Sequence, residues 1–193
     1  MNIALFGGSF DPPHIAHQMI CFYLIEYRGF DRVFLIPTYK HAFGKKLTAF
    51  EHRLEMCFLL ADPFNDKVTV TGIEEELVEK GGDGSTIDTI KDFKLHFPED
   101  TGTLVIGSDI LRELHKWKDF EGIQKLVDVM CFTRDGYSFT ESSMVTIEEY
   151  FNKPEVSSTR IRTLLGKGES VSRLVYPPVL EYIRKHKLYI RVS

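Results

Sequence analysis

Residues 1–17 read MNIALFGGSFDPPHIAH, and this stretch decides the fold. Ile3–Phe6 is a short apolar run that ends at a glycine pair, which is typical of a buried parallel strand. Gly7 and Gly8 place no side chain between the backbone and whatever lies above the strand end. The stretch therefore predicts a buried strand followed by a tight turn that a ligand can approach closely.

The residues after the glycines predict a helix start that suits an anion. Ser9 and Asp11 are favoured in turns and at helix N-caps, and two prolines follow. His14 and His17 stand three residues apart, so a helix that begins here carries both imidazoles on one face. The free N–H groups and the positive dipole end of such a helix favour a phosphate.

Composition places the chain among globular proteins with a sizeable core. Its 193 residues suit one domain, or one domain with a helical appendage, and its net charge of −4 argues against a nucleic-acid binder. No apolar run reaches membrane-spanning length, and the strand that begins at residue 2 leaves no room for a signal peptide. Three single cysteines without metal spacing predict buried thiols in a reducing cytoplasm: Cys21, Cys57 and Cys131.

Apolar runs and helical periods alternate along the chain. Strands are predicted at 3–6, 33–36, 68–70, 103–106 and 127–133. Helices are predicted at 15–28, 50–61, 86–97, 157–165 and 177–186. Three segments are less clear: 74–80 is charged and ambiguous, 110–126 is helical in parts, and 137–150 is irregular with one strand near residue 145.

This alternation predicts an α/β protein with a Rossmann-like, doubly wound parallel sheet in one domain, 1–193, with a small helical part at about 157–193. Ligands of such sheets bind beyond the carboxyl ends of the strands. The glycine turn, the loop after Pro37, the turn at Gly107 and the turn at Arg134 all follow predicted strand ends. We therefore expect these four segments to converge on one edge.

A second candidate anion site lies at residues 157–162. Ser157, Ser158 and Thr159 are capping residues, and the triplet alone is typical of an ordinary helix N-cap. Arg160 and Arg162 follow within the first turns, and guanidinium groups beside hydroxyls and free N–H groups favour an anion.

The two motifs together resemble those of the nucleotidyltransferase superfamily. Residues 7–17 are similar to its Gly-Gly-Ser/Thr-Phe-Asp-Pro-x-His-x-Gly-His signature, with Ala16 in place of a glycine. Residues 156–162 are similar to its Ile-Ser-Ser-Thr-x-Ile-Arg motif, with Val156 in place of isoleucine. The resemblance implies attack on the α-phosphate of a nucleoside triphosphate.

Further segments resemble the nicotinate- and nicotinamide-nucleotide adenylyltransferases. These segments are 50–56, Thr86–Thr89, Val105–Asp109 followed by Trp117, and 132–136. Two departures leave the acceptor open between acid, amide and another mononucleotide: Gly84-Ser85 stands where serine and tyrosine are usual, and residues 39–45 replace a Pro-Pro-His-Lys loop.

The resemblance implies a role for each matching residue. His14 and His17 are the expected catalytic residues. The expected ATP-binding residues are Gly7, Gly8, Ser9, Phe10, His14, His17, Gly107, Asp109, Ser157, Ser158, Thr159 and Arg162. The expected mononucleotide-binding residues are Lys45, Arg53, Ser85, Thr86, Trp117 and Arg134. Magnesium is expected to arrive with ATP, without protein metal ligands. The expected partners are ATP and a pyridine mononucleotide, with no nucleic acid and no membrane, and a homo-oligomer is compatible with the sequence.

Several of these residues also have ordinary structural explanations. Asp109 could be a helix cap, Trp117 could be a core aromatic, and lysines 45 and 46 could be solvated loop charges. Arg53 near a helix start opposes the helix dipole, which favours an anionic partner. Backbone N–H groups at Ser85 and Thr86 are expected to favour a carboxylate, and thus nicotinate mononucleotide.

Two other functions remain open from the sequence. The same fold could transfer a nucleotide to another acceptor, such as phosphopantetheine or a phosphorylated sugar or alcohol. A nucleotide sensor that binds ATP without turning it over is the alternative of a different class, although it would not need both histidines.

Overall fold

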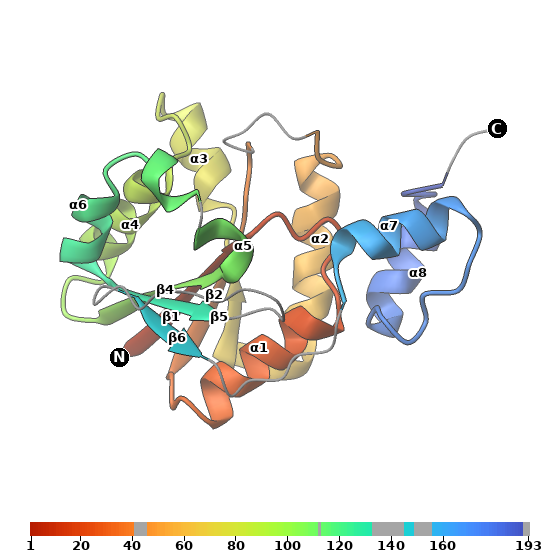
Figure 1. The fold of residues 1–193 in the computed structure, drawn as a ribbon, viewed down its shortest axis with the longest axis horizontal. Coiled ribbons are helices and arrows are strands. Elements are labelled where there is room, and N and C mark those ends of the chain that lie inside the picture. The colour runs from red at the N-terminus through yellow and green to blue at the C-terminus, as the bar shows by residue number, and fades with distance from the viewer. Residues whose placement is uncertain (41–45, 112, 133–144, 149–155, 191–193) are drawn as a thin grey trace.

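A computed structural model describes residues 1–40, 46–111, 113–132, 145–148 and 156–190. At its centre lies a parallel sheet with the strand order β3-β2-β1-β4-β5-β6 (Figure 1). The strands are β1 (Asn2–Gly8), β2 (Arg32–Pro37), β3 (Val68–Val70), β4 (Thr101–Gly107), β5 (Asp128–Phe132) and β6 (Thr146–Glu148). The order runs outward from β1 in both directions, so the predicted doubly wound α/β fold is confirmed.

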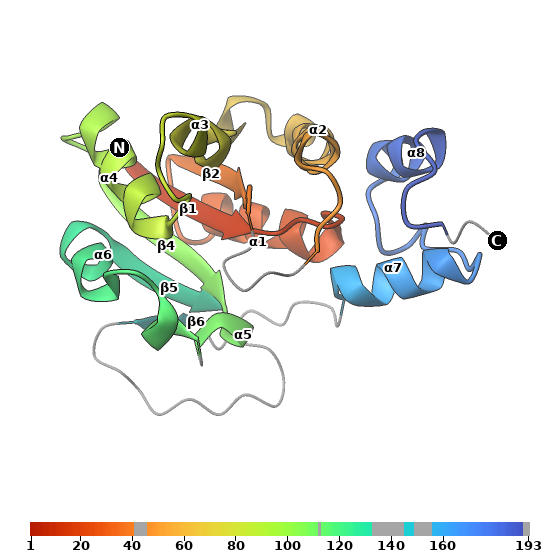
Figure 2. The ribbon, with the colours of Figure 1, turned by 90° about the horizontal axis from the view of Figure 1, so that it is seen from above.

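Helices cover both faces of this sheet (Figure 2). The α-helices are α1 (Ile15–Glu26), α2 (Phe50–Ala61), α3 (Ile73–Glu79), α4 (Thr86–His96), α5 (Ser108–Leu111), α6 (Phe120–Leu126), α7 (Ser158–Gly166) and α8 (Pro177–Lys185). Two 3₁₀ helices are η1 (Asp62–Lys67) and η2 (Leu114–Lys116). None of the helices within the described ranges is long and apolar enough to cross a membrane.

Alternation along β1 divides the core into two layers. Ala4 and Phe6 belong to the buried cluster that α1 and α2 share, whereas Ile3 and Leu5 belong to the cluster under α4 and α6. Successive side chains of a strand point to opposite faces, so an uninterrupted apolar run serves both layers at once.

The C-terminal helices extend the layer of α1 and α2. Figures 1 and 2 show α7 and α8 at one end of the molecule, beside α2. Ile161 of α7 and Ile183 of α8 are fully buried in the same cluster as Leu24 of α1. This shared cluster places the 157–162 motif on the same side of the sheet as α1, which begins after its N-cap residue His14.

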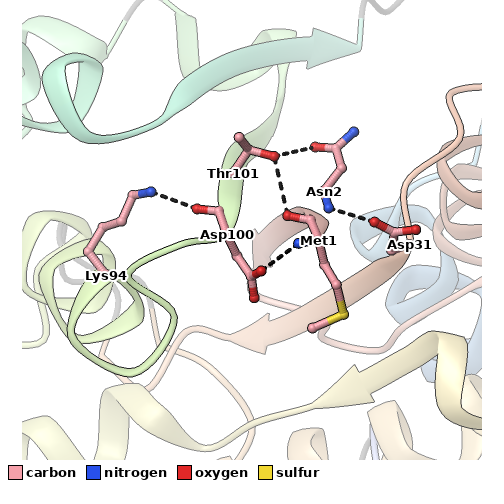
Figure 3. A network of polar contacts seen from close by, with 6 residues as sticks. All are labelled: Met1, Asn2, Asp31, Lys94, Asp100 and Thr101. Atoms are coloured by element: carbon pink, nitrogen blue, oxygen red, sulfur yellow. Dashed lines mark hydrogen bonds and ion pairs between the residues drawn. The ribbon is translucent and has the colours of Figure 1, made fainter.

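A polar network fixes the other end of β1 (Figure 3). The N-terminal amino group pairs with the carboxylate of Asp100, and the backbone N–H of Asn2 donates to Oδ2 of Asp31 at 2.7 Å. Thr101 Oγ1 donates to the Met1 carbonyl at 3.3 Å, which joins the first residue of β4 to the residue just before β1. The network lies at the amino ends of the strands and leaves the carboxyl ends to the ligand edge.

The less clear segments are resolved as follows. Residues 74–80, which gave no clear signal, form most of α3. The strand expected near residue 145 is β6, while 133–144 and 149–155 lie outside the described residues. Residues 110–126 are helical in parts, as expected, although α5 begins at Ser108, two residues earlier.

Candidate active site

A cavity of about 680 Å³ lies beyond the carboxyl ends of the strands. Gly8, Thr38, Gly107 and Phe132 line it, and each stands at or just after the end of a different strand. Gly8 pairs with Pro37, and Gly107 pairs with Phe132, so these ends are level across the sheet. The convergence predicted for the turns after β1, β2 and β4 is therefore observed.

The two glycines of the opening motif serve different purposes. A Cβ at Gly7 would meet no atom within 4 Å, so this position opens into free space at the strand end. A Cβ at Gly8 would lie 3.2 Å from the ring of Phe10. Phe10 is buried and has a φ of 45°, and its ring also packs edge-on against Phe6. Gly7 thus leaves room for a ligand, while Gly8 leaves room for the aromatic side chain that shapes the turn.

The two histidines stack on each other at the start of α1. Their ring centroids are 3.7 Å apart with an angle of 25° between the planes, and both residues line the cavity. The backbone N–H of His14, the N-cap residue, donates to Nδ1 of His17 at 3.1 Å. Because Nδ1 of His17 accepts this bond, the proton of its neutral ring lies on Nε2. The cap thus makes the other ring nitrogen of His17 a hydrogen-bond donor.

Asp11 of the same motif is buried and serves the structure rather than a ligand. Its Oδ1 accepts a 2.7 Å hydrogen bond from the hydroxyl of Tyr189, and its Oδ2 accepts one of 3.3 Å from the N–H of Thr48. The carbonyl of Asp11 accepts a bond of 2.6 Å from Nη1 of Arg162. One residue of the opening turn therefore holds three segments that are far apart in the sequence.

The start of α7 faces the same cavity. Ser157, Ser158, Thr159 and Arg162 all line it, so the structure brings the two predicted anion motifs together. The Ser157 hydroxyl caps the helix by accepting from the N–H of Arg160 at 3.2 Å, and the Ser158 hydroxyl donates to the carbonyl of Pro12 at 2.9 Å. The Ser158 hydroxyl thus also holds the helix start against the opening turn.

Ser85, Thr86 and Trp117 line the other half of the cavity. We call this part, on the side of α3 and α4, the acceptor half. Trp117 is half-buried and packs edge-on against Phe120, so it belongs to both the core and the cavity wall. The N–H of Ser85 already donates to Oδ1 of Asp83 at 3.0 Å. In this structure the N–H of Ser85 is therefore engaged within its own loop, and the ligand contact expected from Ser85 and Thr86 stays a prediction.

Arg53 lies beneath the cavity and is absent from its lining. The side chain is 1% exposed and donates to three backbone carbonyls: Thr48 at 2.8 Å, Ser9 at 3.0 Å and Tyr39 at 3.4 Å. Its place near the start of α2 therefore reflects a role in joining loops, and direct contact with a mononucleotide does not fit this burial.

Lys40 and Glu74 are two of the lining residues that were not named from the sequence as ligand contacts. Lys40 lines the cavity three residues after β2, where Lys45, further along the loop, had been named. Glu74, at the start of α3, also lines it and is 7% exposed. It stands first in a run of three glutamates, which hides an inward-facing carboxyl among solvated ones. The one available signal in the sequence is that Glu74 stands two residues after Gly72, the residue that caps α3.

Some expected site residues cannot be placed. Lys45 and Arg134 lie outside the described residues, and so does the side chain of Asp109, although its backbone belongs to α5. Lys46 is exposed and does not line the cavity. Within the described part of the chain, no group of three or more histidine, cysteine, aspartate or glutamate side chains is arranged to hold a metal ion.

Comparison with known proteins agrees with this geometry. A family model described as Cytidylyltransferase-like matches residues 5–164. A probable nicotinate-nucleotide adenylyltransferase of Myxococcus xanthus is 39% identical over 98% of this chain and 95% of its own length. One from Thermus thermophilus is 32% identical over 98% of this chain and 100% of its own.

A solved structure shows the same fold. The Plasmodium falciparum nicotinic acid mononucleotide adenylyltransferase complexed with NaAD superposes with a TM-score of 0.81 at 22% identity, covering 100% of this chain and 99% of that one. The fold and the paired motifs define a nucleotidyltransferase. The chain belongs to the cytidylyltransferase-like family and, within it, to the nicotinate-nucleotide adenylyltransferases.

Proposed function

We propose that the protein joins the AMP moiety of ATP to nicotinate mononucleotide, giving the dinucleotide and pyrophosphate. The single observation that carries this proposal is the cavity itself, in which the stacked His14–His17 pair and the α7 start lie on one side and Trp117 lies on the other. The names of the relatives, and the NaAD bound to the Plasmodium falciparum structure, support the pyridine nucleotide as acceptor.

The chemistry exchanges one P–O bond for another. An oxygen of the mononucleotide phosphate forms a bond to the α-phosphorus of ATP, and the bond from that phosphorus to the bridging oxygen of pyrophosphate breaks. The attacking oxygen is already an anion, so no general base is needed. Catalysis then depends on positioning and on hydrogen bonds that strengthen as charge moves to the leaving group.

The two histidines are suited to this task. The N–H at Nε2 of His17 can donate a hydrogen bond to a phosphate oxygen of the substrate. The centroid of the stacked His14 ring lies 3.7 Å from that of His17. The helix dipole of α1 adds positive potential at the same point. The α7 start, with Arg162, lies on the same side and is suited to the β- and γ-phosphates.

Magnesium fits this site as an ion that binds together with the nucleotide. With no cluster of three metal-ligating side chains among the described residues, phosphate oxygens and water are its main ligands in the proposal. When bound, the ion neutralises charge on the triphosphate. The three cysteines are buried and no disulfide joins them, which agrees with a reducing, cytoplasmic location.

Pyrophosphate release tests the proposal. The protein is incubated with ATP, magnesium and, in turn, nicotinate mononucleotide, nicotinamide mononucleotide and phosphopantetheine. Release with nicotinate mononucleotide as the best acceptor supports the proposal. Pyrophosphate release with phosphopantetheine alone would instead indicate a nucleotidyltransferase with another acceptor. ATP binding without pyrophosphate release from any acceptor would indicate a nucleotide sensor.

A further inference from the structure

The acceptor half of the cavity contains one buried carboxyl group among its described lining residues. Lys40, Asp83, Lys116 and Lys118 line the same region and are exposed. Glu74 is 7% exposed, so its carboxyl reaches the cavity from within the protein rather than from solvent. Buried ionisable groups are costly, and one that also faces a ligand cavity is a candidate for a functional role.

One oxygen of this carboxyl is fixed and the other is available. Oε2 of Glu74 accepts a 2.9 Å hydrogen bond from the backbone N–H of Tyr39, the second residue after β2. No described residue forms a hydrogen bond with Oε1. The side chain therefore has a defined position, with one oxygen left for a group that enters the cavity.

The surroundings of Glu74 favour its neutral form. Burial raises the pKa of Glu74 to about 7, and the hydrogen bond from Tyr39 and the charge of Arg53 on α2 only partly oppose this. Lys40, from the loop after β2, and Asp83, from the loop before α4, also line the cavity, and both side chains are exposed to solvent. Near neutral pH, a good share of the molecules therefore carries a carboxyl O–H that can donate.

We propose that Glu74 determines acceptor specificity, because its protonated carboxyl donates a hydrogen bond to the carboxylate of the pyridine ring. This inference rests on the proposed function. A hydrogen bond from a neutral donor to a carboxylate is stronger than one to the carbonyl of an amide. Ionised Glu74 reverses the balance, since it repels a carboxylate and accepts from an amide N–H₂. The preference for acid over amide must therefore fall as Glu74 loses its proton.

The test measures kcat/KM for nicotinate and nicotinamide mononucleotide between pH 5.5 and 9. The ratio of the two values is the readout, because both substrates carry the same phosphate and its ionisation cancels. In the wild type, we expect a level ratio below about pH 7 and a fall of up to about tenfold per pH unit above it. Glu74→Gln keeps a donor at every pH, so its ratio is expected to stay level throughout. The control, Glu79→Gln, changes an exposed glutamate of the same helix and is expected to retain the wild-type profile.

A second measurement needs no variant. Calorimetric titration of the wild type at pH 8, repeated in two buffers with different ionisation enthalpies, counts the protons bound with the ligand. Nicotinate mononucleotide should take up close to one proton more than nicotinamide mononucleotide. The inference would be overturned by a wild-type ratio that does not vary with pH, or by equal proton uptake with the two mononucleotides. It would also be overturned if Glu74→Gln lowered kcat/KM equally for both substrates, because that result would point to a contact with a ribose hydroxyl. Failure of the proposed function would look different, with no pyrophosphate from either mononucleotide.

Discussion

The hydroxyl of Tyr189 donates a 2.7 Å hydrogen bond to Oδ1 of Asp11, a residue 178 positions earlier in the chain. The bond connects the segment after α8 to the turn that precedes the two histidines. Because the carboxylate of Asp11 is buried, loss of this donor leaves a charged acceptor with one partner fewer.

Tyr189→Phe should therefore lower the free energy of unfolding by about 1.5–3 kcal/mol, the range for a hydrogen bond to a charged group. Urea denaturation measures the change. Tyr27→Phe removes a hydroxyl from an exposed tyrosine and should stay within about 0.5 kcal/mol of the wild type. Equal stability of Tyr189→Phe and the wild type would show that the contact contributes nothing.

His17→Ala should lower kcat by about 10²–10³, the cost of one donor to developing charge, and change ATP affinity far less. His17→Asn is the matched variant, because its side-chain oxygen can still accept from the N–H of His14 while the donor at Nε2 is lost. Single-turnover kinetics and ATP titration give the two constants. If His17→Asn retains wild-type turnover, the histidine acts only as a helix cap.

Arg162→Ala should weaken binding of ATP and pyrophosphate by about tenfold or more, the size of one charge-assisted contact, and leave mononucleotide binding within about twofold. Arg162 lines the cavity, whereas Arg160 of the same helix is exposed outside it, so Arg160→Ala is the control. Calorimetry with each ligand measures the effect. An equal loss for ATP and mononucleotide would indicate that the opening turn has moved, since Nη1 of Arg162 also donates to the Asp11 carbonyl.

Trp117→Ala should raise KM for both pyridine mononucleotides by similar factors, on the order of tenfold for the loss of one stacking contact. The ratio of acid to amide should hardly change, because stacking does not read the ring substituent. Steady-state kinetics with both substrates decide this. A reversed preference in the variant would mean that Trp117 contacts the substituent itself.

Glu74→Gln should alter the pH dependence of stability. The pKa of Glu74 is raised in the folded state to about 7 from a reference value of 4.5, so the folded state binds more protons between these values and loses stability as pH rises through this window. Glutamine does not ionise, so the variant has no such cost. The free energy of unfolding of Glu74→Gln, relative to that of the wild type, should rise by about 1–3 kcal/mol between pH 4.5 and pH 8. Urea denaturation at both pH values measures this change. The same difference in free energy of unfolding between variant and wild type at the two pH values would contradict the prediction.

The fold could be predicted because its signals are local. The apolar run at Ile3–Phe6 and the helical period of 50–61 match β1 and α2 to within two residues. The two anion motifs were recognisable because both depend on short spacings. The ambiguity at 74–80 arose because α3 is a short helix of mostly half-buried residues and depends on packing for its stability.

The candidate site was harder to predict where function depends on burial. In the sequence, Arg53 resembles a ligand contact and Glu74 resembles a surface charge, but their side chains are 1% and 7% exposed. Both positions are set by backbone groups of the loop after β2, since Arg53 donates to the carbonyl of Tyr39 and Glu74 accepts from its N–H. Such pairings between distant segments leave no periodic pattern in the sequence.

The three carbonyls that Arg53 holds have an evolutionary consequence. Every amino acid brings the same carbonyl to its position, so Ser9, Tyr39 and Thr48 can each be replaced without removing the acceptor. The side chains of Tyr39 and Thr48, two described residues of the loop after β2, are then free to diverge while their carbonyls keep their contacts with Arg53. A lineage could in this way remodel the region that meets the acceptor, residue by residue, provided that the arginine underneath is kept.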